Sequence, residues 1–407
     1  AALQGNTSLL YFDPGLDHEL PEAYNGLGFK NLVYLAIQVS HFHLQWINTK
    51  EKRPYCQMIF IEEPEAHLHS QVQQTFIANI WEIVRKAACE SGEPDKVPQL
   101  TISTHSSHIL DTIDFNKVRY FRRCVLIGED PSAVKTLNAS NVLSLRSFRP
   151  NMESADGVLE DSEDTLKFLK KYMKLTHCDL FFSDAAILVE GTVEKLLLPE
   201  MINKSAPELN RVYLTTLEVG GAYASRFASL LSFLGMPYLV ITDLDSVDPE
   251  KNRSACRADT TGAVTSNSSL KFYLGLSSIS DLSVLEEPEK VVSNEIGYIA
   301  FQQPTPVDSY GVGLKLTGRT LEETFIYQNI AIFSEGKIPL SISFSGEIDS
   351  DYELVYQTIR GSSFKKTEFA LNTIFSTEDW EVPEYIARGL IWLKGKTCPD
   401  KAEAAEV

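Results

Sequence analysis

The chain has 407 residues, of which 43% are hydrophobic and 23% are charged, so its composition is that of a folded globular protein and not of a disordered one. Lys and Arg total 37 against 55 Asp and Glu, and the net charge of −18 argues against a protein that coats DNA through bulk positive charge. No apolar run approaches the ~20 residues of a membrane span. Six scattered cysteines without a C-x-x-C pair favour the reducing cytoplasm over a disulfide framework.

The first predicted region, residues 1–130, contains two apolar runs that end in polar residues. Residues 58–61 form a continuous apolar run suited to a buried parallel strand, and they are followed by Glu62-Glu63-Pro64-Glu65. An amphipathic helix comes next, with apolar residues at every fourth position. Residues 99–103 then predict a second strand with Thr104-His105 at its tip. Since α/β sheets bind ligands at the carboxyl ends of their strands, the two tips predict one site.

The rest of the chain predicts an α/β fold with helical additions. Residues 131–182 are expected to form a connector, and the acidic run at 153–164 is expected to be a solvated face of it. From 183 to 345, short apolar strands alternate with helical patterns, which predicts a Rossmann-like domain with a parallel sheet and an insertion. Residues 346–407 predict a C-terminal helical region.

Two strand ends in the α/β domain carry paired carboxylates. The apolar run at 185–189 ends in Glu190, and Glu194 lies in the first turn of the helix that follows. The run at 237–242 ends in Asp243-Leu244-Asp245. Because both strand ends are predicted at the same edge of one sheet, we expect the four carboxylates to converge there.

Crowded carboxylates raise each other's pKa, and a divalent cation relieves this repulsion. Oxygen-only ligands favour Mg²⁺ or Mn²⁺, whose remaining positions are filled by water and by phosphate oxygens of a substrate. Two such ions suit phosphodiester hydrolysis, in which one activates water and the other stabilises the leaving oxygen. His67-x-His69 and His105-x-x-His108 offer an alternative zinc site, but they lack a further ligand at zinc spacing.

These motifs resemble those of a known family. The segment Glu190-Gly191-Thr192-Val193-Glu194, followed by Asp243-Leu244-Asp245, resembles the Toprim domain. The segment from Ile59 to His69 resembles the Walker B strand and D-loop of an ABC-type ATPase head, and residues 25–31 resemble its signature loop. An ATPase head followed by Toprim is the layout of the OLD (overcoming lysogenisation defect) nucleases, and residues 318–323 and 383–387 are similar to those of class 2 members.

The resemblance implies a DNA endonuclease that uses two metal ions, Mg²⁺ or Mn²⁺. The implied ligands are Glu190, Glu194, Asp243 and Asp245, with Glu322 or Glu323 completing the second site. The resemblance also implies a catalytic lysine, for which Lys366 is the first candidate and Lys365 the second. A fixed ammonium group would stabilise the charge that develops on the phosphate. Phage defence or DNA repair is implied by the resemblance alone.

In the ATPase head, the resemblance implies that Glu62 positions magnesium, Glu63 activates water and His105 contacts the γ-phosphate. No Walker A motif G-x-x-x-x-G-K-[ST] occurs in the chain, and residues 313–320 match it only with Arg in place of Lys. The motif is expected to lie before Ala1. We therefore expect ATP to act only in the complete protein, which is expected to be a homodimer.

Two other functions fit the same motifs: an SMC/RecF-like DNA-repair ATPase module with a non-catalytic Toprim domain, and a primase-like nucleotidyl transferase. In each case DNA is the expected partner and no membrane is involved. Because the total charge is negative, DNA contact is expected from local basic residues. The candidates are Arg119, Arg122, Arg123, Arg146 and Arg149.

Overall fold

The computed structural model describes residues 10–12, 19–21, 26–66, 68–126, 137–150, 162–173, 178–220, 223–311 and 313–398. It divides into two compact units, Ala1–Val118 with Met173–Cys178, and Arg119–Tyr172 with Asp179–Val407. The expected boundary at residue 130 falls inside a hairpin, because β5 (Arg119–Leu126) pairs with β6 (Leu137–Ser144) along eight residues. Both strands belong to the second unit. Residues 151–161 of the expected acidic connector lie outside the described residues.

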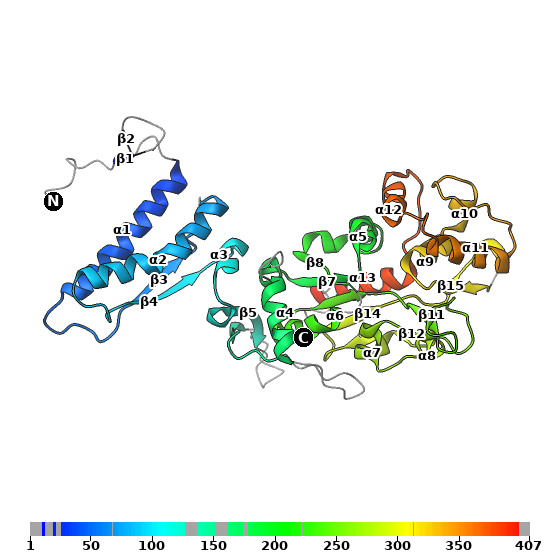
Figure 1. Cartoon of the computed structure of the whole chain (residues 1–407), viewed down its shortest axis with the longest axis horizontal. Coiled ribbons are helices and arrows are strands. Elements are labelled where there is room, and N and C mark those ends of the chain that lie inside the picture. The colour runs from blue at the N-terminus through cyan, green and yellow to red at the C-terminus, as the bar shows by residue number, and fades with distance from the viewer. Residues whose placement is uncertain are drawn as a thin grey trace. The chain divides into compact units, whose positions relative to one another are not determined.

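The first unit places two long helices beside a two-stranded parallel sheet (Figure 1). Its described elements are β1 (Leu10–Phe12), β2 (Glu19–Pro21), α1 (Leu27–Asn48), β3 (Met58–Glu62), α2 (Ser70–Glu90), β4 (Gln99–Ser103) and α3 (Ser107–Thr112). Phe76, Ile80 and Val84 recur at every fourth position of α2 and are buried. The apolar stripe in the sequence is therefore the face of this helix that packs on the sheet.

Strand β3 differs from the prediction of a fully buried strand. Ile59 and Ile61 are buried in the core of the first unit, whereas Met58 and Phe60 are 51% and 65% exposed. In the described part of this unit, β3 has β4 as its sheet neighbour and no second one. Helices cover one face of the pair, so alternate residues of the apolar run are buried and the others are exposed.

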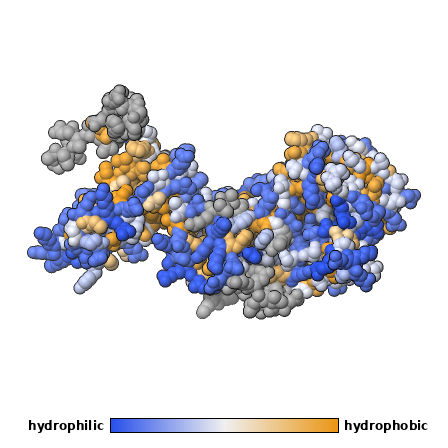
Figure 2. Space-filling view, viewed as in Figure 1, coloured by the Kyte–Doolittle hydropathy of each residue, from blue (hydrophilic) through white to orange (hydrophobic). Residues whose placement is uncertain are grey.

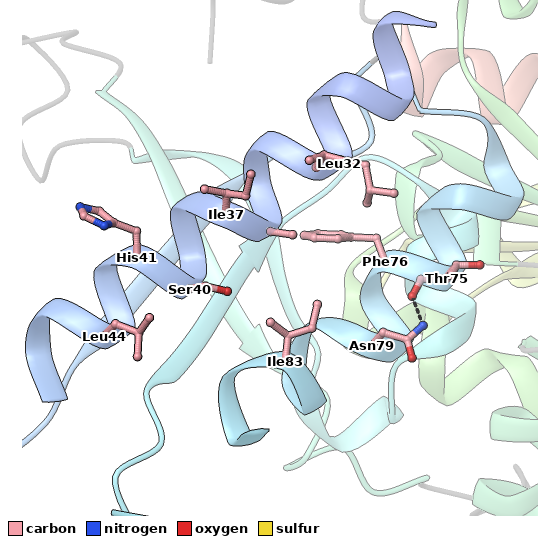
Figure 3. Close-up of a pocket in the computed structure, with 11 residues that line it drawn as sticks. Leu32, Ile37, Ser40, His41, Leu44, Thr75, Phe76, Asn79 and Ile83 are labelled. Atoms are coloured by element: carbon pink, nitrogen blue, oxygen red, sulfur yellow. Dashed lines mark hydrogen bonds between the residues drawn. The ribbon is translucent and has the colours of Figure 1, made fainter. Parts of the chain in front are cut away.

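A groove of about 570 Å³ lies between α1 and α2. Leu32 and Ile37 line it from α1, Phe76 and Ile83 line it from α2, and Figure 3 shows Phe76 pointing toward α1. Figure 2 shows apolar residues gathered on the surface over α1. None of the carboxylates predicted to form a site lines this groove.

The second unit is built on a five-stranded sheet. Its first elements after the hairpin are α4 (Ser162–Tyr172), β7 (Ala185–Val189), α5 (Thr192–Ser205), β8 (Leu214–Glu218), α6 (Ala224–Leu234), β9 (Tyr238–Ile241), β10 (Ser246–Asp248), β11 (Ser254–Ala255), β12 (Val264–Thr265), α7 (Ser268–Leu274) and α8 (Ile279–Leu282). They are followed by β13 (Val291–Val292), β14 (Gly297–Ala300), β15 (Thr305–Pro306), β16 (Lys315–Leu316), α9 (Leu321–Gln328), α10 (Ile330–Ser334), α11 (Ile348–Arg360), α12 (Lys366–Phe375) and α13 (Glu384–Thr397).

The strand order of the large sheet is β13-β14-β9-β7-β8, in which the last four are parallel and β13 runs antiparallel at the edge. Every residue of β7, β9 and β14 is buried. Parallel strands covered on both faces have such continuous apolar sequences. The predicted fold class, α/β with a parallel sheet and helices, is confirmed.

Helices α5 and α13 pack on one face of this sheet and share its core with β7, β9 and β14. Gly389 allows the close approach of α13, since a Cβ there would lie 2.6 Å from Leu239 Cδ1 and 3.3 Å from Ala300 Cβ. Helix α12 in turn packs on α5. The described helices beyond residue 346 therefore belong to the same core as the sheet. None of the described helices has both the length and the apolarity needed to cross a membrane.

Candidate active site

Three adjacent parallel strands end at one edge of the large sheet. Val189 of β7 lies opposite Ile241 of β9, and Ala300 of β14 lies opposite the same residue on its other side. The residues that follow these strands therefore emerge side by side. They are Glu190 after β7, Thr242 and Asp243 after β9, and Gln302 after β14.

Glu190 is held by hydrogen bonds from the end of β9 and from a loop downstream. Its Oε1 atom accepts from the Thr242 hydroxyl, from the Asp243 backbone N–H at 3.0 Å and from Asn267 Nδ2 at 2.8 Å. Glu194 lies one helical turn away on α5, where its Oε2 atom accepts from the Gly191 N–H at 3.2 Å. The first carboxylate pair is thus fixed at the same sheet edge as Asp243.

Asp243 is buried, and its Oδ1 atom accepts two hydrogen bonds. Gln302 Nε2 donates at 2.6 Å, and the Leu321 N–H at the start of α9 donates at 2.9 Å. Asp245, two residues on, has a φ of +48° and forms an ion pair with Arg319 at 2.7 Å. Its backbone N–H also donates to the Arg319 carbonyl. The loop before α9 is therefore tied to both aspartates.

Helix α9 brings two more carboxylates to this edge. Glu322 and Glu323 are both buried, although they lie in the first turn of the helix. Lys366 Nζ lies 2.9 Å from Glu322 Oε1, and its side chain stays 55% exposed while that of Glu322 is 2% exposed. Glu323 Oε2 accepts from the Arg319 N–H at 2.8 Å. Lys365, the second candidate for a catalytic lysine, is exposed at the residue before α12.

Burial and mutual repulsion raise the pKa of the clustered carboxyl groups. The pKa of Glu194 rises to about 7, first because of burial and then because of the charges of Glu322 and Glu190. The pKa of Asp243 lies well above its usual range for the same reasons, with Asp245 adding a further repulsion. Burial also raises the pKa of Glu190, against the hydrogen bonds that lower it. These carboxylates therefore lie within electrostatic reach of one another.

The pKa values of Glu323 and Lys366 are also raised. Burial raises the pKa of Glu323 to about 7. Burial alone would lower the pKa of Lys366, but the Glu322 carboxylate raises it overall, and Asp243 and Glu194 add to that effect. The ammonium group of Lys366 is thus held charged beside the cluster.

The donor set fits a hard divalent cation, since it consists of carboxylate oxygens. Glu322 Oε2 and Glu323 Oε1 are buried and have no hydrogen-bond partner among the described residues. In the described part of the chain, no three His, Cys, Asp or Glu side chains are arranged to hold a metal ion as they stand. His67 of the zinc alternative lies outside the described residues. Glu322 and Asp245 each use one carboxylate oxygen in an ion pair, with Lys366 and Arg319 respectively.

Four residues of this edge were not among the sequence candidates: Thr242, Asn267, Gln302 and Arg319. Thr242 is the first residue after β9, although the predicted strand included it, and Gln302 follows β14 after Phe301, so the rule that located Asp243 could have found Gln302. Arg319 lies in the segment that also contains Glu322 and Glu323. Asn267 ends a loop more than seventy residues from Glu190, and the sequence carries no local signal for its place.

The ATP-related residues of the first unit meet at the ends of β3 and β4. Glu62 ends β3, and Glu63 follows it with a φ of +43°. His105 Nε2 lies 3.4 Å from Glu63 Oε1. Glu65 accepts a hydrogen bond from the His105 N–H at 2.6 Å, which fixes the tip of β4 against the loop after β3. Glu63 and His105 thus face each other, while Glu62 lies at the strand end beside them.

The parallel sheet, its carboxylate edge and the separate strand pair define a two-part protein with a Toprim domain and an ATPase segment. Comparison with known families agrees. Residues 3–110 match the AAA ATPase domain, and residues 181–245 match the TOPRIM domain of the overcoming lysogenization defect protein-like family. The predicted combination of an ATPase segment and an OLD-like TOPRIM domain is confirmed.

Individual proteins show the same likeness. The chain is 31% identical over 404 residues to "Endonuclease GajA" of Bacillus cereus (strain HuB5-5). This match covers 93% of this chain and 54% of that protein. The chain is 23% identical over 231 residues to "OLD nuclease" of Thermus scotoductus (strain ATCC 700910 / SA-01), covering 56% of this chain and 37% of that one. The solved C-terminal region of the Burkholderia pseudomallei OLD protein is 18% identical, covers 53% of this chain and 100% of its own, and has a TM-score of 0.31. The chain spans about half the length of the first of these relatives.

Proposed function

We propose that this chain carries the catalytic site of a metal-dependent DNA endonuclease of OLD type, class 2, which hydrolyses phosphodiester bonds. The observation that carries the proposal is the carboxylate edge. Three chain segments bring the pairs Glu190 and Glu194, Asp243 and Asp245, and Glu322 and Glu323 to one place, and several of their pKa values are raised. The printed names of two relatives, an endonuclease and a nuclease, support the same reaction.

In this proposal Glu190, Glu194, Asp243 and Asp245 hold the cations, and Glu322 or Glu323 completes the second position. Bound Mg²⁺ or Mn²⁺ supplies charge neutralisation for the phosphate and activation of the attacking water. Lys366 contributes a fixed positive charge next to Asp243 and Glu194. Because such a charge is already in place before the reaction, it stabilises the developing negative charge without reorganisation. Glu322 holds the ammonium in position through its ion pair.

The test is incubation of supercoiled plasmid with the purified chain and Mg²⁺ or Mn²⁺. The proposal predicts cleavage that EDTA stops and that Glu190→Gln reduces by at least 100-fold. Metal-independent DNA binding without cleavage would instead favour a repair ATPase module with a non-catalytic Toprim domain. Extension of a labelled primer with nucleotides would favour a primase-like transferase. Either result replaces the nuclease proposal.

ATP belongs to a separate part of the proposal. Glu63 and His105 face each other as a hydrolytic pair would, but the chain contains no Walker A loop to hold the phosphates. We therefore assign no ATP hydrolysis to this polypeptide on its own. Since ABC-type heads act in pairs, the complete protein is proposed to be a homodimer. Size measurement by light scattering of the complete protein, with and without ATP, tests that statement.

A further inference from the structure

Two buried amide side chains at the sheet edge have their orientation fixed by backbone donors. Asn267 caps α7, and its Oδ1 atom accepts from the Ser269 and Leu270 N–H groups at 2.9 and 3.3 Å. Since only the oxygen of an amide can accept, its Nδ2 atom must face the other way. That atom donates to Glu190 Oε1 at 2.8 Å and to Thr242 Oγ1 at 2.7 Å.

Gln302 repeats this arrangement on the neighbouring strand. Its Oε1 atom accepts from the Leu244 N–H at 2.7 Å, so its Nε2 atom faces Asp243 Oδ1 at 2.6 Å and the Tyr385 hydroxyl at 3.2 Å. The side chain is fully buried. Neither amide carries a charge, so each orients a carboxylate without neutralising the negative charge that would attract a cation.

Each amide therefore holds one oxygen of a carboxylate and leaves the other oxygen available. Glu190 Oε1 and Asp243 Oδ1 each accept at least two hydrogen bonds, whereas the described residues donate none to Glu190 Oε2 or Asp243 Oδ2. We propose that Asn267 and Gln302 are positioning residues that turn the second oxygens of Glu190 and Asp243 toward the bound cation. This inference rests on the proposed function, because it concerns the same site.

A purely structural role makes a different prediction. Capping of α7 needs only an acceptor, and Ser supplies one as well as Asn does. Asn267→Ser therefore keeps the cap and removes the donor to Glu190. If Asn267 served only the helix, this variant would bind cations as the unmodified chain does. If it orients Glu190, cation affinity falls although the fold is kept. Groups that orient metal ligands change metal affinity by about 10- to 100-fold when they are replaced.

Matched controls exist elsewhere in the second unit. Asn329 is as buried as Asn267, its Nδ2 atom donates to two carbonyl groups and its Oδ1 atom accepts from the Glu381 N–H. Gln328, which is only partly buried, likewise accepts from the Glu384 N–H, and it donates to the Val382 carbonyl and to Glu381 Oε2. Neither amide donates to a carboxylate of the cluster. Asn329→Ser and Gln328→Met are therefore the controls for Asn267→Ser and Gln302→Met.

The experiment is calorimetric titration of Mn²⁺ into the full chain without DNA, with Tm in EDTA measured on the same samples. We expect Asn267→Ser and Gln302→Met to weaken Mn²⁺ binding about 10- to 100-fold, with Tm changes no larger than those of their controls, which bind Mn²⁺ normally. In plasmid cleavage, kcat should fall while KM for DNA is unchanged. Unaltered Mn²⁺ affinity in both variants would overturn the positioning role even if the chain cuts DNA. If the unmodified chain binds Mn²⁺ but cuts no DNA, only the proposed nuclease function is refuted. If the unmodified chain binds no Mn²⁺, both the nuclease function and the positioning role are refuted.

Discussion

Replacing Glu323 by Gln should stabilise the metal-free protein at alkaline pH. The side chain is 1% exposed, its Oε1 atom has no partner among the described residues, and burial raises its pKa from 4.5 to about 7. The native state thus keeps the proton up to about pH 7, whereas the unfolded chain releases it near pH 4.5. The contribution of the buried, protonated Glu323 to the free energy of unfolding is fully present below pH 4.5 and is lost as the pH rises through 7.

The size of the effect follows from the difference between the two pKa values. At about 1.4 kcal/mol for each pH unit, ionising Glu323 costs the native state roughly 3 kcal/mol at pH 8 and under about 1 kcal/mol at pH 5. Gln has nearly the same shape and no charge to bury. At roughly 2–4 °C per kcal/mol for a unit of this size, Glu323→Gln should raise Tm in EDTA by several degrees at pH 8 and by little at pH 5.

The assay is thermal unfolding of the full chain in EDTA at pH 5 and pH 8, repeated with Mg²⁺. Asp351→Asn is the matched control, since Asp351 is equally buried but its carboxylate accepts from Ser345, Gly346 and Tyr310, which lower its pKa despite burial. Its stabilising contribution is present above the unfolded pKa of 3.8 and is lost only as the pH falls below that value, so Asp351→Asn should lower Tm by a similar amount at pH 5 and pH 8. A Glu323→Gln variant that is less stable than the unmodified chain at pH 8 in EDTA would refute the reasoning. So would a Tm difference that is the same at both pH values.

Three further predictions follow from the same site and from the ATPase segment. Lys366→Met should reduce the rate of single-turnover DNA cleavage by about 10- to 100-fold, the size expected for a charged hydrogen-bonding group. Lys365→Met should leave the rate within about twofold of that of the unmodified chain. Equal losses in the two variants would contradict the choice of Lys366 as the catalytic lysine. Arg319→Ala removes the counter-charge of Asp245 and should therefore lower Tm in EDTA. The increase in Tm on adding Mg²⁺ should become larger, and an unchanged increase would argue against cation binding beside Asp245. The purified chain should release no more phosphate from ATP than its Glu63→Gln variant does. Robust ATP turnover would refute the proposal that this polypeptide alone does not hydrolyse ATP.

The carboxylate edge could be predicted because the information is local. The runs at 185–189 and 237–242 are buried strands in one parallel sheet, and the direction of parallel strands places Glu190 and Asp243 at the same end. Glu322, Glu323 and Lys366 came from the family resemblance, and the structure places all three beside this edge. Residue spacing alone gives no reason to bring α9 and α12 there.

The parts that could not be predicted depend on tertiary neighbours. The apolar run of β3 does not specify how many faces are covered, so the exposure of Phe60 is not apparent from it. The eight-residue pairing of β5 with β6 is a long-range property, so the boundary expected at 130 cut through a hairpin. Asn267 reaches Glu190 only because the loop after β12 folds back over the end of β7 and β9.

A crystal structure of the chain grown with Mn²⁺, with data collected at a wavelength that reveals manganese, would show directly whether the carboxylate edge binds cations. We expect two manganese ions ligated by oxygens of Glu190, Glu194, Asp243 and Asp245 with Glu322 or Glu323, and no ions in crystals of Asp243→Asn. Manganese bound elsewhere in the chain, with none at this edge, would contradict this expectation.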